Sequence, residues 1–330
     1  MVTKVRWGIL GTGMITGALI RGIRASGNGE LVAIASRDLD KAEKAAAEHN
    51  IPRAYGSYEE LLADREVEAI YNPLPNALHA PWTIKAAVAK KHILCEKPLA
   101  PTPAECARMI VAAKKHRVVL MEAFMYRFHP QTKKIKELID AGAIGKLLQV
   151  RSAFTFNLNL NDLSNVRLSK SLIGGSVMDV GCYCINLSRY LFGREPSEVF
   201  GVANYGKKSR VDEQMIGVLR FGEGVAYFDS SFQVTFRAFA EAVGSAGKIV
   251  IPSPWKPPNP STITLTSRGK TEEIIVQGGD PYKLQVDHFN AVVRRKAKLG
   301  FPPTDGVANA RVMQALLKSA RKNCVVRVTP

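Results

Sequence analysis

Two short segments hold the residues best suited to proton transfer. Lys97 follows a run that predicts a strand, and Pro98 keeps it out of the helical region. Asp179 and Tyr183 are four residues apart in a segment that predicts a helix, so both can contact one ligand. Tyrosine can pass a proton to or from a substrate oxygen, and aspartate can orient a hydroxyl or a cation. These residue types predict acid–base chemistry; the alternative for Tyr183 is a core tyrosine whose hydroxyl caps a neighbour.

A glycine-rich turn lies at the other end of the chain. Residues 8–17 follow a predicted strand, Val5–Leu10, and open the first predicted helix. Gly11 allows a tight turn, and Gly13 lets the backbone approach a pyrophosphate at the helix N-terminus. Thr16 stands at the third small position, which departs from the usual pattern. In this strand–turn–helix context the turn predicts a dinucleotide site.

The end of the second predicted strand bears on the choice of dinucleotide. NAD sites usually place a carboxylate there to hold the ribose 2′-hydroxyl. Here Ser36 and Arg37 occupy the tip, and a guanidinium suits a 2′-phosphate. We therefore expect NADP. NAD stays an alternative if Asp38 turns inward, and Arg37 could instead be a solvated loop charge.

The first half of the chain alternates between buried strand-like runs and amphipathic helical stripes. This alternation predicts a doubly wound parallel sheet, a Rossmann domain, over residues 1–125. Its elements are expected at Val5–Leu10, Met14–Ser26, Glu30–Ala35, Leu39–Ala46, Tyr58–Leu62, Ala69–Tyr71, Trp82–Ala89, His92–Cys95, Pro101–Lys115 and Val118–Met121.

The second half changes to period-two patterns with few helices. It predicts an α+β domain with a large, mostly antiparallel, open-faced sheet over residues 126–330. Strands are expected at Ser152–Leu158, Gln214–Phe221, Val225–Phe232, Arg237–Val243, Lys248–Ile251, Ile263–Thr266 and Glu273–Val276, and helices at Gly175–Phe192, Asp287–Lys298 and Val307–Lys322. Because several strands are apolar on both faces, as around Ile216 and Met215, we expect a homodimer or higher homo-oligomer through the open face.

Composition excludes several other classes. The chain has 330 residues and a formal net charge of +17, but the basic residues are dispersed and not interleaved with aromatics, so we expect no nucleic-acid partner. Its apolar runs are too short to cross a membrane. The five cysteines show neither Cys-x-x-Cys nor metal-ligand spacing, so no metal is expected. Met1–Leu10 has no signal-peptide pattern, and we expect a cytoplasmic protein.

The motifs in this order resemble those of the glucose–fructose oxidoreductase, inositol dehydrogenase and rhizopine catabolism oxidoreductase family. The resemblance rests on the opening turn and on Asn72–His79, Cys95–Leu99 and Gly174–Tyr183, and it extends from Val5 to about Val328. Within the family it is closest to dimeric dihydrodiol dehydrogenases and sugar dehydrogenases. In many relatives a histidine stands where this chain has Tyr183.

The resemblance implies a set of site residues. Lys97, Asp179 and Tyr183 would be catalytic, with Lys97 beside the nicotinamide and the substrate hydroxyl. Substrate contacts are expected from Asp179, Tyr183, Arg127 at the domain junction, Asn165 and Arg167. His79 is either a contact near the nicotinamide or an ordinary helix-terminal histidine, and Glu96 is either structural or a cofactor contact. The expected cofactor-binding residues are Gly11, Gly13, Met14, Ile15, Ser36, Arg37, Pro73, Asn76, His79, Glu96 and Lys97.

Together these features predict an NADP-dependent oxidoreductase. A hydride would pass between the nicotinamide and a sugar, keto-sugar or cyclic trans-diol. Lys97 and Tyr183 would handle the proton, and Asp179 would position them. The alternative is a catalytically silent NAD(P)-sensing regulatory protein, against which the three intact residues argue.

Overall fold

The computed structural model describes residues 4–329, which form two compact units. Unit 1 contains the described residues up to Phe128 together with Asp280–Val307. Unit 2 contains His129–Gly279 and the described residues from Ala308 onward. The first crossing, after Phe128, lies three residues from the expected boundary at 125. The return of residues 280–307 to unit 1 was not expected from the sequence.

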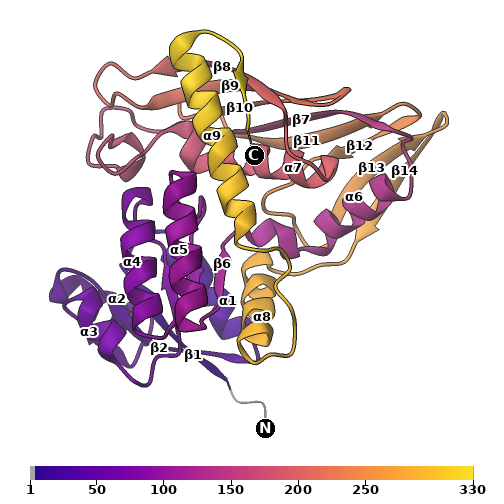
Figure 1. Ribbon diagram of the computed structural model, residues 1–330. Coiled ribbons are helices and arrows are strands. Elements are labelled where there is room, and N and C mark those ends of the chain that lie inside the picture. Colours follow the sequence, from indigo (N-terminus) through magenta and orange to yellow (C-terminus); the bar gives the residue numbers. More distant parts are fainter. Residues whose placement is uncertain (1–3, 330) are drawn as a thin grey trace. The chain divides into compact units, whose positions relative to one another are not determined.

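Unit 1 is built on a six-stranded parallel sheet with the strand order β3-β2-β1-β4-β5-β6. Helices flank this sheet (Figure 1). The order turns back at β1, and such a switch point places the carboxyl ends of β1 and β4 beside a ligand crevice. The elements in chain order are β1 (Val5–Leu10), α1 (Thr16–Ala25), β2 (Gly29–Ala35), α2 (Leu39–Glu48), β3 (Arg53–Tyr55), α3 (Tyr58–Ala63), β4 (Ala69–Asn72), α4 (Asn76–Val88), β5 (His92–Cys95), α5 (Pro103–His116), β6 (Leu120–Glu122), the 3₁₀ turn η1 (Met125–Phe128) and α8 (Pro281–Val293).

Helix α8 packs against α1, which explains why this late segment belongs to unit 1. Gly22 makes the close approach possible, because a Cβ there would lie 2.9 Å from the backbone carbon of Tyr282. Asn290 accepts a hydrogen bond from the indole nitrogen of Trp7 at 3.0 Å. Such contacts depend on residues that are 260 or more positions apart in the sequence, so local periodicity did not indicate them.

Unit 2 is built on a nine-stranded sheet with the order β14-β13-β12-β11-β7-β10-β9-β8-β15. Neighbouring strands of this sheet pair antiparallel, except that β7 and β10 are parallel. Its elements are α6 (Pro130–Asp140), β7 (Leu147–Thr155), the 3₁₀ turn η2 (Val166–Leu168), the π-helical turn η3 (Val177–Gly181), α7 (Cys182–Phe192), β8 (Glu198–Tyr205), β9 (Asp212–Phe221), β10 (Gly224–Ser231), β11 (Arg237–Gly244), β12 (Gly247–Ile251), β13 (Ser261–Ser267), β14 (Lys270–Val276), most of α9 (Thr304–Lys322) and β15 (Val326–Arg327). Both parts of the expected fold class are confirmed.

Several helices and strands were missed, and one strand ends early. Helix α6 is amphipathic, with Ile135 and Ile139 buried, but the lysines between its apolar residues made the helical pattern hard to recognise in the sequence. The short strand β3 and the strand β8, which lies next to the edge of its sheet, were also not predicted. Strand β7 stops at Thr155, so Phe156 and Leu158 lie beyond it. Their backbone N–H groups still donate to Ser231 O and Phe232 O, and their side chains pack on a small core of Leu168, Val180 and Phe232.

The two faces of the unit 2 sheet differ in what covers them. Met215 and Leu219 on β9 are fully buried, and α9 packs on this face, where Ser319 accepts a hydrogen bond from Gly201 N. The alternate residues point the other way: Ile216 is 50% exposed and Val218 38% exposed. Val202 and Tyr227, their cross-strand partners, are 54% and 38% exposed. The sheet therefore presents an apolar open face.

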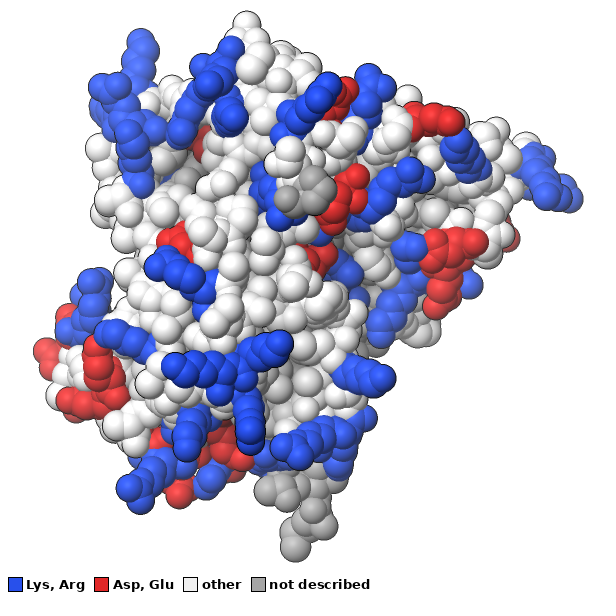
Figure 2. Space-filling model, in the orientation of Figure 1, with Lys and Arg blue, Asp and Glu red and all other residues white. Residues whose placement is uncertain are grey.

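Charge is dispersed over the visible surface. Figure 2 shows lysines and arginines spread across this face, many of them next to acidic side chains. Exposed ion pairs such as Lys85–Glu59 and Arg220–Glu198, at 2.7 and 2.8 Å, are of this kind. Among the residues that the structure describes, no helix is both long and apolar enough to cross a membrane.

Candidate active site

The glycine-rich turn of unit 1 has the backbone geometry of a dinucleotide cradle. Gly11 has φ +96°, a conformation that favours glycine, and a Cβ there would lie 3.2 Å from Leu74 Cδ2. A Cβ on Gly13 would meet nothing within 4 Å, so an anion can approach the backbone there. Met14 is 86% exposed, and Ile15 is the N-cap of α1 without a side-chain capping bond. The turn thus fits a pyrophosphate at a helix N-terminus.

The tip of β2 is arranged in a way that bears on cofactor choice. Ser36 is buried, its backbone N–H donates to Tyr55 O at 3.1 Å, and its hydroxyl accepts from Asp38 N at 3.3 Å. Asp38 is the N-cap of α2, where its carboxylate accepts from Lys41 N at 3.3 Å and pairs with Lys41 Nζ at 3.2 Å. These contacts to Lys41 lower the pKa of Asp38. Arg37 is exposed beside them.

Hydrogen bonds of buried side chains hold the segment after β4 in place. Asn72 donates to His79 O and to Thr83 Oγ1, and it accepts from Leu74 N. His79 is buried, and its ring nitrogens lie 2.8 Å from Pro98 O and 2.7 Å from Leu74 O. Burial lowers the pKa of His79, while its contacts with the two carbonyl oxygens oppose this shift, and the ring joins two loops. Its direct contact with the nicotinamide stays a prediction, as do those of the half-buried Pro73 and Asn76.

The loop that carries Lys97 is held on several sides. Glu96 accepts from Tyr71 Oη at 2.7 Å and from Lys97 N at 3.2 Å. Glu122 accepts from Leu99 N at 2.7 Å. The Lys97–Pro98 peptide bond is cis. The His79 ring also contacts Pro98 O. Together these bonds hold the half-buried Lys97 at the carboxyl end of β5, where the sequence predicted it.

The side chain of Arg127 contacts other residues of unit 1. Its guanidinium lies 3.8 Å from Asp305 Oδ2 and stacks over Phe301 with 4.7 Å to the ring centre. Its side chain is only 10% exposed. Arg127 therefore ties η1 to Phe301 and to Asp305 in the first turn of α9, and its contact with substrate stays a prediction.

In unit 2 the structure brings three predicted residues together. Arg167 Nε donates to Asp179 Oδ2 at 2.6 Å, and Asn165 caps η2 by accepting from Arg167 N at 3.1 Å. Gly174 and Gly175 allow this, because a Cβ on Gly174 would lie 2.2 Å from Arg167 O. The double glycine thus brings the Arg167 backbone against the start of the helix that carries Asp179.

Asp179 lies in a π-helical turn and Tyr183 in the α-helix that follows it. Cys182 N donates to Val177 O, five residues back, which is the π pattern and was not predicted. Such turns often occur at functional sites. Tyr183 is buried and packs edge-to-face on Phe154, with ring centres 5.5 Å apart, and beside Trp255 at 5.6 Å. Trp255 comes from the loop between β12 and β13.

A buried carboxylate that the sequence did not indicate holds the start of this helix. Asp212 Oδ2 accepts from Val177 N at 2.8 Å and from Ser176 Oγ at 3.0 Å. A Cβ on Gly175, which has φ +112°, would lie 2.2 Å from Asp212 Oδ1. Burial raises the pKa of Asp212 to about 6. The only available signal in the sequence was an acidic residue shortly before a predicted strand, which is too common to be informative.

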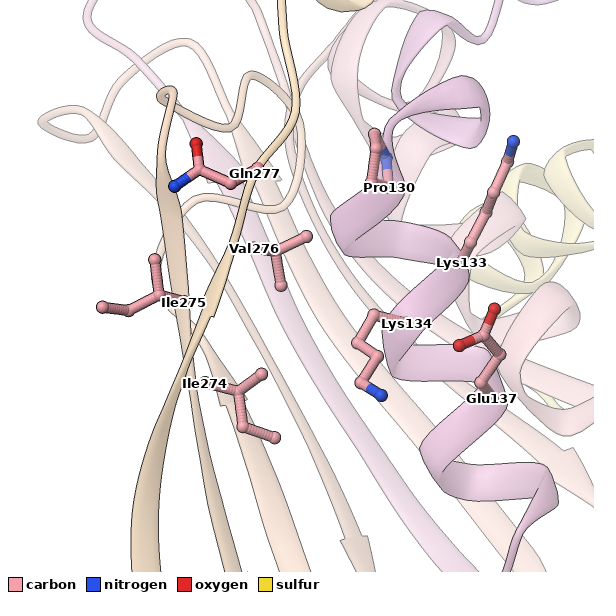
Figure 3. A pocket seen from close by; sticks show the side chains of 8 residues that line it. All are labelled: Pro130, Lys133, Lys134, Glu137, Ile274, Ile275, Val276 and Gln277. Carbon is pink, nitrogen blue, oxygen red and sulfur yellow. The ribbon is translucent and has the colours of Figure 1, made fainter.

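A hollow of 340 Å³ opens between α6 and β14. Figure 3 shows Lys133, Lys134 and Glu137 on the helix and the 274–277 segment across from them. None of the predicted site residues lines this hollow. We therefore do not assign the reaction to it.

Comparisons with known proteins agree with this geometry. Residues 5–124 match the model of an oxidoreductase family with an NAD-binding Rossmann fold, and residues 132–250 match the GFO/IDH/MocA C-terminal domain. The D-xylose 1-dehydrogenase (NADP(+)) 2 of Haloferax volcanii is 36% identical over 326 residues, which cover 98% of this chain and 99% of that protein. The trans-1,2-dihydrobenzene-1,2-diol dehydrogenase of Xenopus tropicalis is 36% identical over 261 residues, 78% of each chain.

A solved structure is similar over nearly the whole length. The aldose-aldose oxidoreductase from Caulobacter crescentus, complexed with glycerol, has a TM-score of 0.89 at 28% identity and covers 98% of this chain and 99% of that one. The resemblance inferred from the motifs is confirmed. The chain belongs to the GFO/IDH/MocA oxidoreductase family, a family of NAD(P)-dependent dehydrogenases and reductases that act on CH–OH groups.

Proposed function

We propose that this protein is an NADP-dependent oxidoreductase that transfers a hydride between the nicotinamide and a sugar, keto-sugar or cyclic trans-diol. The observation that carries the proposal is the grouping of Asp179, Arg167 and Tyr183 at the start of η3 and α7. A carboxylate with its guanidinium can bind hydroxyl groups, and a tyrosine can exchange a proton with an alcohol or carbonyl oxygen. The relatives named for xylose and for a dihydrodiol agree with this substrate class.

Each residue has a distinct role in the proposed step. Bound NADP would accept or supply the hydride. Tyr183 and Lys97 take up or release the hydroxyl proton of the substrate. Asp179 orients the substrate hydroxyl, and Arg167 fixes the carboxylate through its 2.6 Å bond. Arg127 and Asn165 are proposed as outer contacts.

The preference for NADP rests on the β2 tip. Because Asp38 serves as the N-cap of α2 and pairs with Lys41, its carboxylate is committed to the helix. Arg37 is exposed at the place where the ribose 2′-position of a Rossmann-bound dinucleotide lies. A permanent planar cation there favours a 2′-phosphate over a hydroxyl.

We also propose a two-fold homodimer in the cytoplasm. Val202, Ile216, Val218 and Tyr227 form an apolar patch on the open sheet face, and burying it against a second copy would remove it from water. The buried cysteines Cys95, Cys106, Cys182 and Cys184 form no disulfide bonds, which agrees with a reducing compartment.

Reduction of NADP in the presence of a panel of aldoses, inositols and cyclic trans-diols tests the proposal. We expect turnover with at least one cyclic or polyhydroxylated substrate. NADP(H) binding without turnover on any member of the panel, in either direction, would favour the silent regulatory protein instead.

A further inference from the structure

A tyrosine outside the expected site borders the dinucleotide turn. Tyr58 begins α3, and its hydroxyl lies 3.8 Å from the position that a Cβ on Gly11 would take. Its ring is buried and packs edge-to-face on Trp82, with ring centres 4.8 Å apart. The ring is therefore fixed, and its polar end faces the turn that fits the dinucleotide.

The same hydroxyl is close to Arg37. Burial raises the pKa of Tyr58, while the charge of Arg37 and a hydrogen bond from it oppose the rise. Gly11 follows β1 and Arg37 follows β2, so Tyr58 stands beside the ends of two adjacent parallel strands. In a Rossmann domain the adenosine ribose of the dinucleotide lies at these strand ends.

We propose that the Tyr58 hydroxyl is a specificity-determining group for the 2′-phosphate of NADP. The hydroxyl accepts a hydrogen bond from the Arg37 guanidinium and donates its own hydrogen to a phosphate oxygen, since a hydroxyl can do both. An exposed arginine is flexible, and a fixed acceptor reduces the entropy that it loses when it binds the phosphate. This inference rests on the proposed use of NADP.

The test compares the dissociation constants of NADPH and NADH, measured by fluorescence titration of the full chain. In Tyr58→Phe the ring and its contact with Trp82 are kept and only the hydroxyl is lost. We expect NADPH to bind about 10-fold more weakly, the loss typical of a hydrogen bond to a charged group, and NADH to change by less than about 2-fold. Tyr55→Phe is the matched control, because the Tyr55 hydroxyl bonds Asp64 Oδ2 at 2.9 Å instead.

The outcomes separate the two proposals. A wild-type chain that binds NADH as tightly as NADPH contradicts the proposed cofactor preference. A wild-type chain that prefers NADPH, with Tyr58→Phe behaving like Tyr55→Phe, overturns the role of Tyr58 alone. In the double variant with Arg37→Ala, the losses should be less than additive because the two groups act on one phosphate.

If Tyr58→Phe folds poorly, a labelled tyrosine at position 58 tests the same inference. The fluorine NMR signal of 3-fluorotyrosine placed at position 58 should shift when adenosine 2′,5′-bisphosphate is added. It should shift much less with adenosine 5′-monophosphate. Equal responses to the two nucleotides would overturn the inference.

Discussion

Arg167 Nε donates a hydrogen bond to Asp179 Oδ2 over 2.6 Å, joining the loop before the double glycine to the π-helical turn. Both side chains are partly exposed, at 32% and 17%, so the pair sits at a surface that a ligand can reach. The carboxylate is thereby held in one orientation by a charge-assisted bond. The proposed orientation of substrate by Asp179 depends on this contact.

Replacement of Arg167 tests that dependence. Arg167→Ala removes the nearest guanidinium from Asp179, and we expect kcat/KM for the substrate to fall about 10-fold. NADPH affinity should stay close to that of the wild type. Lys170→Ala, which removes an exposed cation from the same loop, serves as the control and should change neither quantity. Equal effects of the two substitutions would show that only local charge matters.

The catalytic proposal predicts specific losses. Lys97→Ala and Tyr183→Phe should each lower kcat by about 10²–10⁴-fold, the usual contribution of acid–base groups, with NADPH binding nearly intact. In the double variant the losses should not add, because both groups act on one proton. Steady-state turnover gives kcat, and NADPH fluorescence reports binding separately. Near wild-type kcat in either single variant would remove that residue from the mechanism, and loss of NADPH binding alone would assign Lys97 to cofactor positioning.

We expect the cofactor preference to depend on the charge of Arg37. Arg37→Ala should weaken NADP binding by about 1.5–3 kcal/mol, the worth of one charge-assisted contact, and leave NAD binding almost unchanged. The ratio of the kcat/KM values for the two cofactors is the measurement. An equal decrease for both cofactors would contradict recognition of the 2′-phosphate by this side chain.

The proposed dimer would form through the open sheet face. Ile216→Glu places a charge in the centre of the exposed patch, and we expect it to convert a dimer into a monomer of 36.1 kDa. Light scattering at micromolar concentration measures the mass. Val111→Glu is the matched control, because Val111 is 66% exposed on α5 in unit 1. A monomeric wild-type chain would refute the dimer.

Stability should carry a pH signature from Asp212. Its pKa is raised from 3.8 to about 6 by burial, so the folded state binds this proton more tightly than the unfolded chain does. The stabilisation is complete below pH 3.8 and is lost as the pH rises to about 6, by about 3 kcal/mol in all. Relative to the wild type, Asp212→Asn should therefore gain stability between about pH 4 and 6.

The measurement is the free energy of urea unfolding of both chains across this pH range. The difference between them is needed because carboxylates with a lowered pKa, such as Asp64 and Glu68, change stability in the opposite direction. A difference that does not vary with pH would contradict the raised pKa of Asp212.

The sequence by itself determined the fold class, the dinucleotide turn and the family. Strand β1, Gly11 and α1 are consecutive, and their conformations follow from local rules: a buried apolar run, a glycine in a tight turn and a helical stripe. The motif around Lys97 is equally local, since Pro98 restricts its neighbour wherever the chain goes. Alternation of period two located most strands of unit 2 because one face of that sheet is buried.

Only the tertiary structure decided which distant side chains meet. The bonds from Asp212 to the start of η3 and the ring of Trp255 beside Tyr183 join residues that are far apart in the sequence. Arg167 and Asp179 are nearer in the sequence, but their pairing depends on the close backbone approach at the double glycine. The same holds for Tyr58. In the sequence, a tyrosine at the start of a short helix indicates only core packing, and only the structure places it beside Gly11 and Arg37. Such contacts follow from strand order and close backbone approach. Strand order and backbone approach are set by the packing of the whole unit, so local periodicity in the sequence does not indicate them.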